Sequence, residues 1–188
     1  MGITNDCNKT IHSKISPIYS TIIVLTINTG YFSKHKFKAY RFLIVIKMTT
    51  KQIELVQQSW EKIKPSAQTA GELFYKKLFE RAPQIRHFFA NDVTEQAGRL
   101  TYMLTYIVSR LDKLDTIMED VQRLAVRHNK YGAEPKHYMI VGECLLATLK
   151  EGLGEYWNNE LMQAWASAYD IIANAMIEAQ QESAEKRA

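Results

Sequence analysis

Cysteine is nearly absent from this 188-residue chain, which holds only Cys7 and Cys144. Two cysteines this far apart make neither a disulfide framework nor a metal-binding spacing, so the expected compartment is a reducing cytoplasm. Long apolar runs are also missing. The runs at 22–25 and 42–46 fall far short of the roughly 20 residues that span a bilayer, so no stable membrane insertion is expected.

An excess of positive over negative charge is missing outside the first 47 residues. That segment has seven Lys and Arg against one acidic residue, whereas residues 48–188 have 17 basic and 19 acidic residues, a net charge of −2. Nucleic-acid binding needs a concentrated basic surface, so nucleic acid is not an expected partner. The apolar share of 46% and the charged share of 23% are typical of a globular protein.

Residues 1–47 lack glutamate and glutamine and hold one alanine, while Ile, Lys, Asn, Tyr and Phe supply 24 of the 47 positions. This segment could be a targeting or membrane-surface arm, an extra element, or AT-rich DNA translated upstream of the true start. The third interpretation is favoured because Met48 directly precedes a capping-box pattern, Thr49 to Gln52. We therefore expect an extension over 1–47, disordered or a mis-assigned start, and one domain over 48–188.

The domain over 48–188 reads as helix throughout, since apolar residues recur at steps of three and four with no strand-like alternation. A helix is predicted from Thr49 to 63, and another after Pro65 runs to 82. A short segment follows over 83–89, and an Asp92 and Glu95 capping pattern opens the next helix. Further helices are predicted over 114–128, 135–153 and 158–182. The predicted fold class is all-α.

No Ser or Cys nucleophile accompanies a base and an orienting acid, so a hydrolase triad is not expected. His128 lies on the apolar stripe of its helix, where a core histidine bonded to a carbonyl is the plainer alternative. Gln96 and Leu100 share the inner face of an earlier helix, and Tyr75 also points inward. Gln96 could instead be a rim residue and Tyr75 a core filler. Together with Phe89, these residues suit a pocket for a large apolar cofactor held by one imidazole.

Order and spacing along the chain resemble the globin family, in particular bacterial single-domain globins and the haem domain of flavohaemoglobins. The resemblance covers residues 49 to 182. It is carried by the block 74–79, then Pro83 and Phe89, then Gln96 placed 32 residues before His128, and then the run 137–142. It implies a globin fold of six to eight helices around a haem pocket.

The resemblance also implies residue roles, with haem b as the cofactor and His128 as the iron ligand. Tyr75 and Gln96 would lie on the distal side, and Gly71 and Ala97 would allow two helices to cross closely. Tyr138 would support the histidine, with Gln180 at the position where flavohaemoglobins have a glutamate, so that His128 would be polarised less. Arg99 is a candidate partner for a haem propionate, with a solvated helix face as the alternative. The remaining expected haem contacts are Phe89, Leu100, Leu124 and Val141.

The function implied is reversible O₂ binding for storage, transport or scavenging, with CO and NO as further ligands. An alternative is an NO dioxygenase that uses a reductase in trans. A haem-based gas sensor and a haem-free helical bundle are the other interpretations. A monomer or a homodimer is expected.

Overall fold

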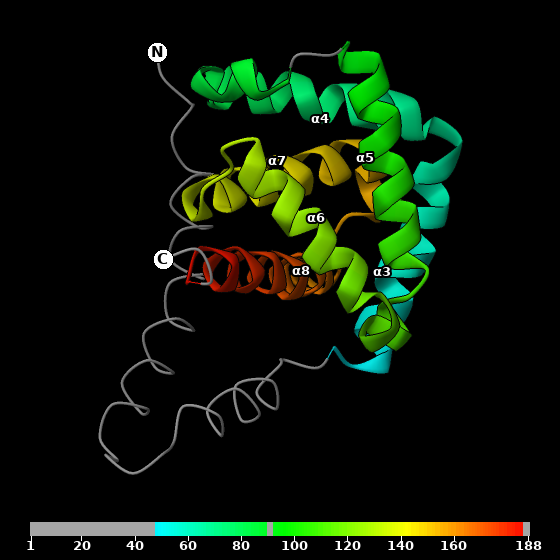
Figure 1. The fold of residues 1–188 in the computed structure, drawn as a ribbon. Coiled ribbons are helices and arrows are strands. Elements are labelled where there is room, and N and C mark those ends of the chain that lie inside the picture. The colour runs from blue at the N-terminus through cyan, green and yellow to red at the C-terminus, as the bar shows by residue number, and fades with distance from the viewer. Residues whose placement is uncertain (1–47, 90–91, 186–188) are drawn as a thin grey trace. The chain divides into compact units, whose positions relative to one another are not determined.

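The computed structural model describes residues 48–89 and 92–185, which belong to one compact unit of the chain. The expectations for residues 1–47 lie outside the described part. Helices make up the fold, and the described residues contain no strand, so the predicted all-α class is confirmed (Figure 1). The α-helices are α3 (Thr50–Ile63), α4 (Ala67–Arg81), α5 (Val93–Val108), α6 (Met118–Lys130), α7 (Pro135–Leu153) and α8 (Asn159–Glu185). Shorter 3₁₀ turns cover Lys64–Ser66, Pro83–Phe88, Leu111–Ile117 and Gly154–Tyr156.

Side chains at the helix starts explain where α3 and α5 begin. The Thr49 hydroxyl accepts a bond from the Gln52 amide at 3.2 Å, and the Gln52 side chain accepts from the Thr49 amide at 2.9 Å. The predicted capping box is therefore confirmed. Asp92 caps α5 through the Thr94 amide at 3.1 Å, but Glu95 bonds to Arg99 instead of closing a box. Only half of the second capping pattern is formed.

The start of α6 differs from the prediction of one helix over 114–128. Residues Leu111–Ile117 form a 3₁₀ segment interrupted at Lys113, where φ is −137°, and α6 begins at Met118. Leu111 and Ile117 are both buried. Their apolar spacing is satisfied by packing against the core, which requires no continuous α-helix.

The helices cross in pairs around a shared interior. Helix α4 packs against α5 and α7, while α8 packs against α6, α3 and α7 (Figure 1). At the α4–α5 crossing, a Cβ added to Gly71 would lie 2.8 Å from the Ala97 Cβ and 2.9 Å from its carbonyl oxygen. The expected close approach of two small residues is confirmed. It fixes α4, which carries Tyr75, against α5, which carries Gln96.

Two buried tryptophans join α3 to its neighbours. The rings of Trp60 and Trp165 meet edge to face with centroids 6.0 Å apart. The Trp60 indole donates to the Thr105 hydroxyl at 3.0 Å, and the Trp165 indole donates to the Ser59 hydroxyl at 2.9 Å. Both polar groups are thus satisfied inside the core.

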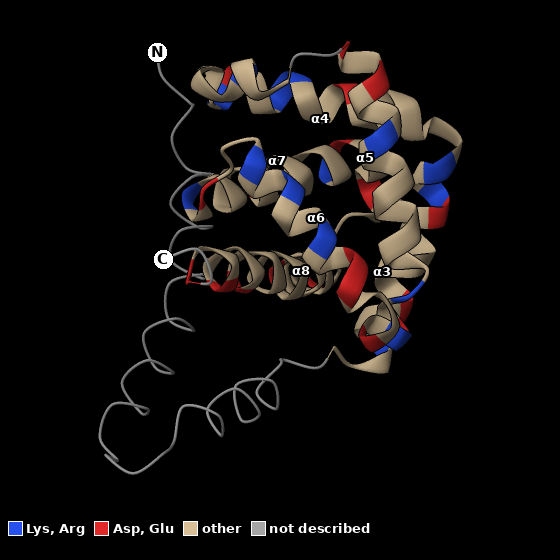
Figure 2. Cartoon of the chain, in the orientation of Figure 1, with Lys and Arg blue, Asp and Glu red and all other residues tan. Residues whose placement is uncertain are grey.

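Both signs of charge occur on the described helices (Figure 2). Several cross-helix ion pairs join them, including Lys51 with Glu160 at 2.5 Å, Lys77 with Glu151 at 2.7 Å and Arg81 with Glu143. Among the helices that the structure describes, none has the length and apolar character needed to cross a bilayer.

Candidate functional site

His128 lies in the last turn of α6 with its ring half-buried. Its Nδ1 is 3.0 Å from the carbonyl oxygen of Leu124. Because a carbonyl only accepts, Nδ1 carries the proton and Nε2 keeps its lone pair. Burial lowers the pKa of His128, and the nearby Arg127 charge lowers it further, against the opposing effect of the Leu124 bond. The result is a neutral imidazole oriented through one nitrogen, as metal-ligating histidines are.

A buried polar pair joins α7 to α8. The Gln180 side chain donates to the Tyr138 hydroxyl at 2.8 Å, and both residues are buried. Burial raises the pKa of Tyr138 to about 12, so the phenol is neutral. The structure thus brings together Tyr138 and Gln180, while the His128 imidazole bonds only within its own helix among the described residues. No ionised group takes part in this pair.

Tyr75 sits on α4 inside a group of aromatic rings. Its ring centroid is 5.1 Å from that of Phe74, 5.7 Å from Phe79 and 5.3 Å from Phe89. The residue is buried, and burial raises its pKa to about 12. No described residue bonds to its hydroxyl. No fully buried side-chain polar atom of the described residues lacks a partner, so the Tyr75 hydroxyl keeps an open side, where a ligand could supply an acceptor.

Helix α5 divides its three candidate residues between two environments. Gln96 and Leu100 are half-buried, and within the described part no group bonds to the side-chain amide of Gln96. Arg99 is exposed and bonds to Glu95 at 2.6 Å. The structure therefore gives Arg99 a place on the solvated face, with its guanidinium already engaged.

The apolar candidates keep part of their surface open although they pack against the core. Phe89, Leu124 and Val141 are all half-buried, as Leu100 is. Their exposed fractions are what an apolar cofactor could cover. Together with the unpaired Tyr75 hydroxyl and the oriented His128, the donor set fits a flat apolar group with one metal-binding position.

Tyr169 is a supporting residue that the sequence did not reveal. Its hydroxyl donates to the Tyr138 carbonyl at 2.5 Å, and burial raises its pKa well above the ordinary value. A Cβ on Gly142 would lie 2.6 Å from the Tyr169 ring. The glycine one turn after Tyr138 was the available signal, because it permits an aromatic ring to approach α7.

A comparison with protein families decides the assignment. The globin family model matches residues 72–176, more than half of the chain. The chain belongs to the globin family. The predicted globin fold is thereby confirmed, and members of this family bind haem.

The most similar globin-containing relatives include bacterial flavohemoproteins. That of Bacillus subtilis is 28% identical over 133 residues, which cover 69% of this chain and 33% of that protein. That of Halalkalibacterium halodurans is 32% identical over 117 residues, covering 60% and 28%. The chain thus spans about a third of the length of the curated relatives it matches.

Solved globin structures agree with the fold. A bacterial globin from Campylobacter jejuni has a TM-score of 0.65 at 23% identity, covering 73% of this chain and 99% of that one. An engineered carbene transferase from Rhodothermus marinus, which carries the name of a nitric oxide dioxygenase, has a TM-score of 0.68 at 25% identity. The match covers 73% of this chain and 96% of that one.

Proposed function

We propose that this globin binds haem b through His128 and binds O₂ reversibly. The observation that carries the proposal is the bond from His128 Nδ1 to the Leu124 carbonyl, which leaves Nε2 available on a half-buried, neutral imidazole. When bound, haem supplies an iron that takes up diatomic gases such as O₂, CO and NO. Phe89, Leu124 and the half-buried Val141 and Leu100 offer the apolar contact surface.

Tyr75 is the residue that would favour O₂ among these gases. Its hydroxyl is neutral and has no partner in the described part of the chain, so it can donate to a ligand with partial negative charge. A hydrogen bond of this kind contributes about 1.5–3 kcal/mol, roughly a 10- to 150-fold change in affinity. The side-chain amide of Gln96 offers a second donor. The proposed outcome is tight retention of O₂.

NO dioxygenation is the second candidate. It is supported by the flavohemoprotein relatives and by the structural neighbour that carries the name of a nitric oxide dioxygenase. In that reaction O₂ and NO combine to give nitrate, and the ferric iron left behind must be reduced by one electron. Gln180 provides a neutral amide beside Tyr138, so this chain polarises the proximal side less than a carboxylate would.

The visible spectrum of the full chain expressed with haem tests the proposal. We expect a Soret band in the ferric and dithionite-reduced forms that shifts on addition of CO. His128→Ala should weaken or alter this band, whereas His87→Ala, which changes an exposed histidine, should not. A colourless protein would overturn the haem assignment, and identical spectra for both variants would overturn the role of His128.

Nitrate formation separates the two candidates. Repeated additions of NO to the O₂-loaded protein, with NADPH and a flavodoxin reductase plus flavodoxin present, should give at most one nitrate per haem if the protein is only a carrier. Sustained turnover would favour the enzyme.

A further inference from the structure

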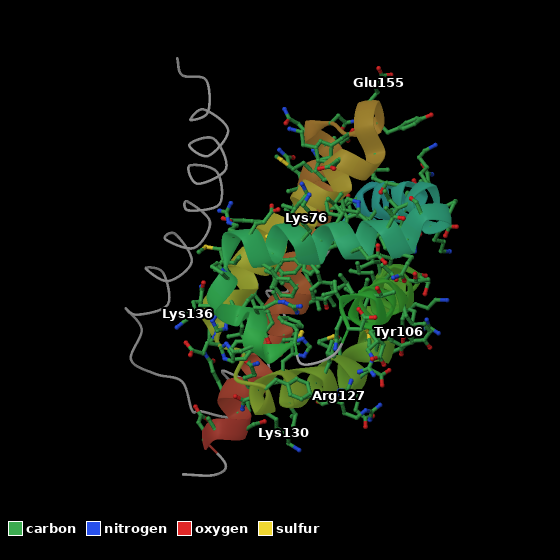
Figure 3. The ribbon with its side chains drawn as sticks, turned by 90° about the horizontal axis from the view of Figure 1, so that it is seen from above. Lys76, Tyr106, Arg127, Lys130, Lys136 and Glu155 are labelled. Atoms are coloured by element: carbon green, nitrogen blue, oxygen red, sulfur yellow. The ribbon has the colours of Figure 1, made fainter. Side chains whose placement is uncertain are left out.

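Tyr106, in the last turn of α5, is bonded to Asp120, in the first turn of α6. The Tyr106 hydroxyl donates to the Asp120 carboxylate, and within the described part no other hydrogen bond or ion pair joins α5 to α6. Figure 3 shows Tyr106 well apart from Lys130, which lies in the last turn of α6. The bond therefore lies at the opposite end of α6 from the turn that carries His128. We call these two residues the Tyr106–Asp120 pair.

Neighbouring charges keep both members of the pair in place. Arg123 donates to the second oxygen of Asp120 and also to Glu119 at 2.5 Å. The Arg110 guanidinium lies 4.2 Å from the centroid of the Tyr106 ring. Their mutual bond raises the pKa of Tyr106 and, with the Arg123 bond, lowers the pKa of Asp120. At neutral pH the donor is thus protonated and the acceptor is charged, which is the stronger kind of hydrogen bond.

The start of α6 has few other connections to α5. Helix α6 begins without a side-chain cap, after the 3₁₀ segment Leu111–Ile117 that is interrupted at Lys113. Both helices contact this segment more than they contact each other. The end of α5, in contrast, is anchored on α3, because the Gln57 side-chain amide donates to the Val108 carbonyl at 3.1 Å. Helix α5 is therefore the fixed support, and the pair ties α6 to it.

The candidate site lies at a distance from the pair along both helices. Gln96 comes ten residues before Tyr106, and His128 comes eight residues after Asp120, which corresponds to about 15 Å and about 12 Å of helix. Figure 1 shows α5 and α6 diverging from the end where the pair lies. A tilt of about 5° at Asp120 would move His128 by about 1 Å. Metal–ligand distances are defined to about 0.2 Å, so the angle between these helices matters at the site.

We propose that the Tyr106–Asp120 pair positions His128 by setting the angle of α6 against α5. The proposal rests on the proposed function, in which His128 binds the haem iron and Gln96 lies on the opposite side. Helix α8 packs along α6, so α6 does not need the pair in order to stay folded. The pair instead determines how far the imidazole lies from the helix that carries Gln96. Both members are positioning residues, since neither touches the candidate site.

Tyr106→Phe tests the proposal, because it removes the hydroxyl and keeps the ring beside Arg110. The matched control is Tyr102→Phe, which removes the hydroxyl of a tyrosine one turn earlier on α5 that is 73% exposed. Resonance Raman spectra of the haem-loaded, dithionite-reduced full chain report the iron–histidine stretching band. We expect Tyr106→Phe to shift and broaden this band and to speed haem transfer to apomyoglobin about two- to fivefold. The control should change neither.

Substitutions of Asp120 complete a double-mutant cycle. Asp120→Ala should shift the band as Tyr106→Phe does, and combining the two should add nothing, because the bond is already lost. Asp120→Asn keeps an acceptor oxygen for the phenol and should give an intermediate band. An unchanged band in Tyr106→Phe, an equal change in Tyr102→Phe, or additive shifts in the double variant would each overturn the proposal.

The haem-free full chain gives a test that does not depend on haem binding. Proton–carbon NMR reports the His128 imidazole resonances, which His128→Gln identifies by their loss. Tyr106→Phe should move these resonances, and Tyr102→Phe should leave them in place. Unmoved resonances in Tyr106→Phe would refute the positioning of His128, whereas a missing Soret band with moved resonances would refute only the proposed function.

Discussion

A single hydroxyl group on α4, that of Tyr75, carries the clearest prediction for ligand binding. Tyr75→Phe should raise the O₂ dissociation rate about 10- to 150-fold, because the lost bond is one of the stronger kind. The substitution should leave the free energy of unfolding unchanged or slightly higher, since the hydroxyl has no protein partner to lose in the described structure. Stopped-flow displacement of O₂ by CO measures the rate.

Carbon monoxide serves as the internal control for Tyr75, because it carries little charge when bound and accepts only a weak hydrogen bond. Its dissociation rate should change far less than that of O₂. The pKa of about 12 keeps the phenol protonated at ordinary pH, so the O₂ dissociation rate should be flat between pH 7 and pH 9. Equal changes in the dissociation rates of both gases would show that Tyr75 does not bond to the bound ligand.

His128 should make the haem-free protein sensitive to acid. Burial lowers its pKa in the folded state below the ordinary 6.5, so the unfolded chain binds a proton more readily. The share of the free energy of unfolding that depends on a neutral, buried His128 is therefore complete above pH 6.5. It is lost as the pH falls below that value. Urea unfolding between pH 7.5 and pH 5 should show a smaller decline for His128→Gln than for the parent. Parallel declines would contradict the assignment.

The hydrogen-bonding partner of a side chain could be predicted where the partner lay within one helical turn. It could be predicted less well where the partner lay on another helix. Arg99 could have been assigned to Glu95 from their four-residue separation, which gives a helix-surface ion pair. The bond between Gln180 and Tyr138 joins residues 42 positions apart. Only the family resemblance placed those two residues at related positions, and nothing local pointed to Tyr169.

The α4–α5 crossing supplies a matched test at the scale of helices. Gly71→Ala should destabilise the protein by about 1–3 kcal/mol, because the new methyl group meets the Ala97 backbone at 2.9 Å. Gly98→Ala, also on this interface, finds only the Gln68 side chain at 3.5 Å and should stabilise by about 0.5–1 kcal/mol. Urea unfolding measures both. If both substitutions changed the free energy of unfolding in the same direction, the α4–α5 crossing would be looser than described.

Helix boundaries followed the sequence where a capping side chain was present. Thr49 and Pro135 mark the starts of α3 and α7 within a residue of the predictions. The start of α6 has no side-chain cap, and the preceding 3₁₀ segment shares its apolar spacing. Periodicity alone could not separate the two, since buried Leu111 and Ile117 satisfy either conformation.

The folded domain should be independent of residues 1–47 of the chain. A chain that begins at Met48 retains the Thr49 capping box and every core contact described here between residues 48 and 185. We expect it to fold with the same thermal midpoint and to bind haem with the same spectrum as the full chain. Circular dichroism melting and haem titration measure this. Insolubility or a lost Soret band would show that residues 1–47 are part of the working protein.

The tryptophan bonds across the core set an order for folding during synthesis. Ser59 and Trp165 are 106 residues apart, so α3 cannot complete its packing until α8 has been made. Contacts between distant segments close late because the entropy of the long loop between them must be lost first. The ribosome releases α8 after the other described helices, and until then α3 lacks the indole that donates to Ser59 and the ring that packs against Trp60. Native packing of α3 is therefore completed only after α8 has left the exit tunnel.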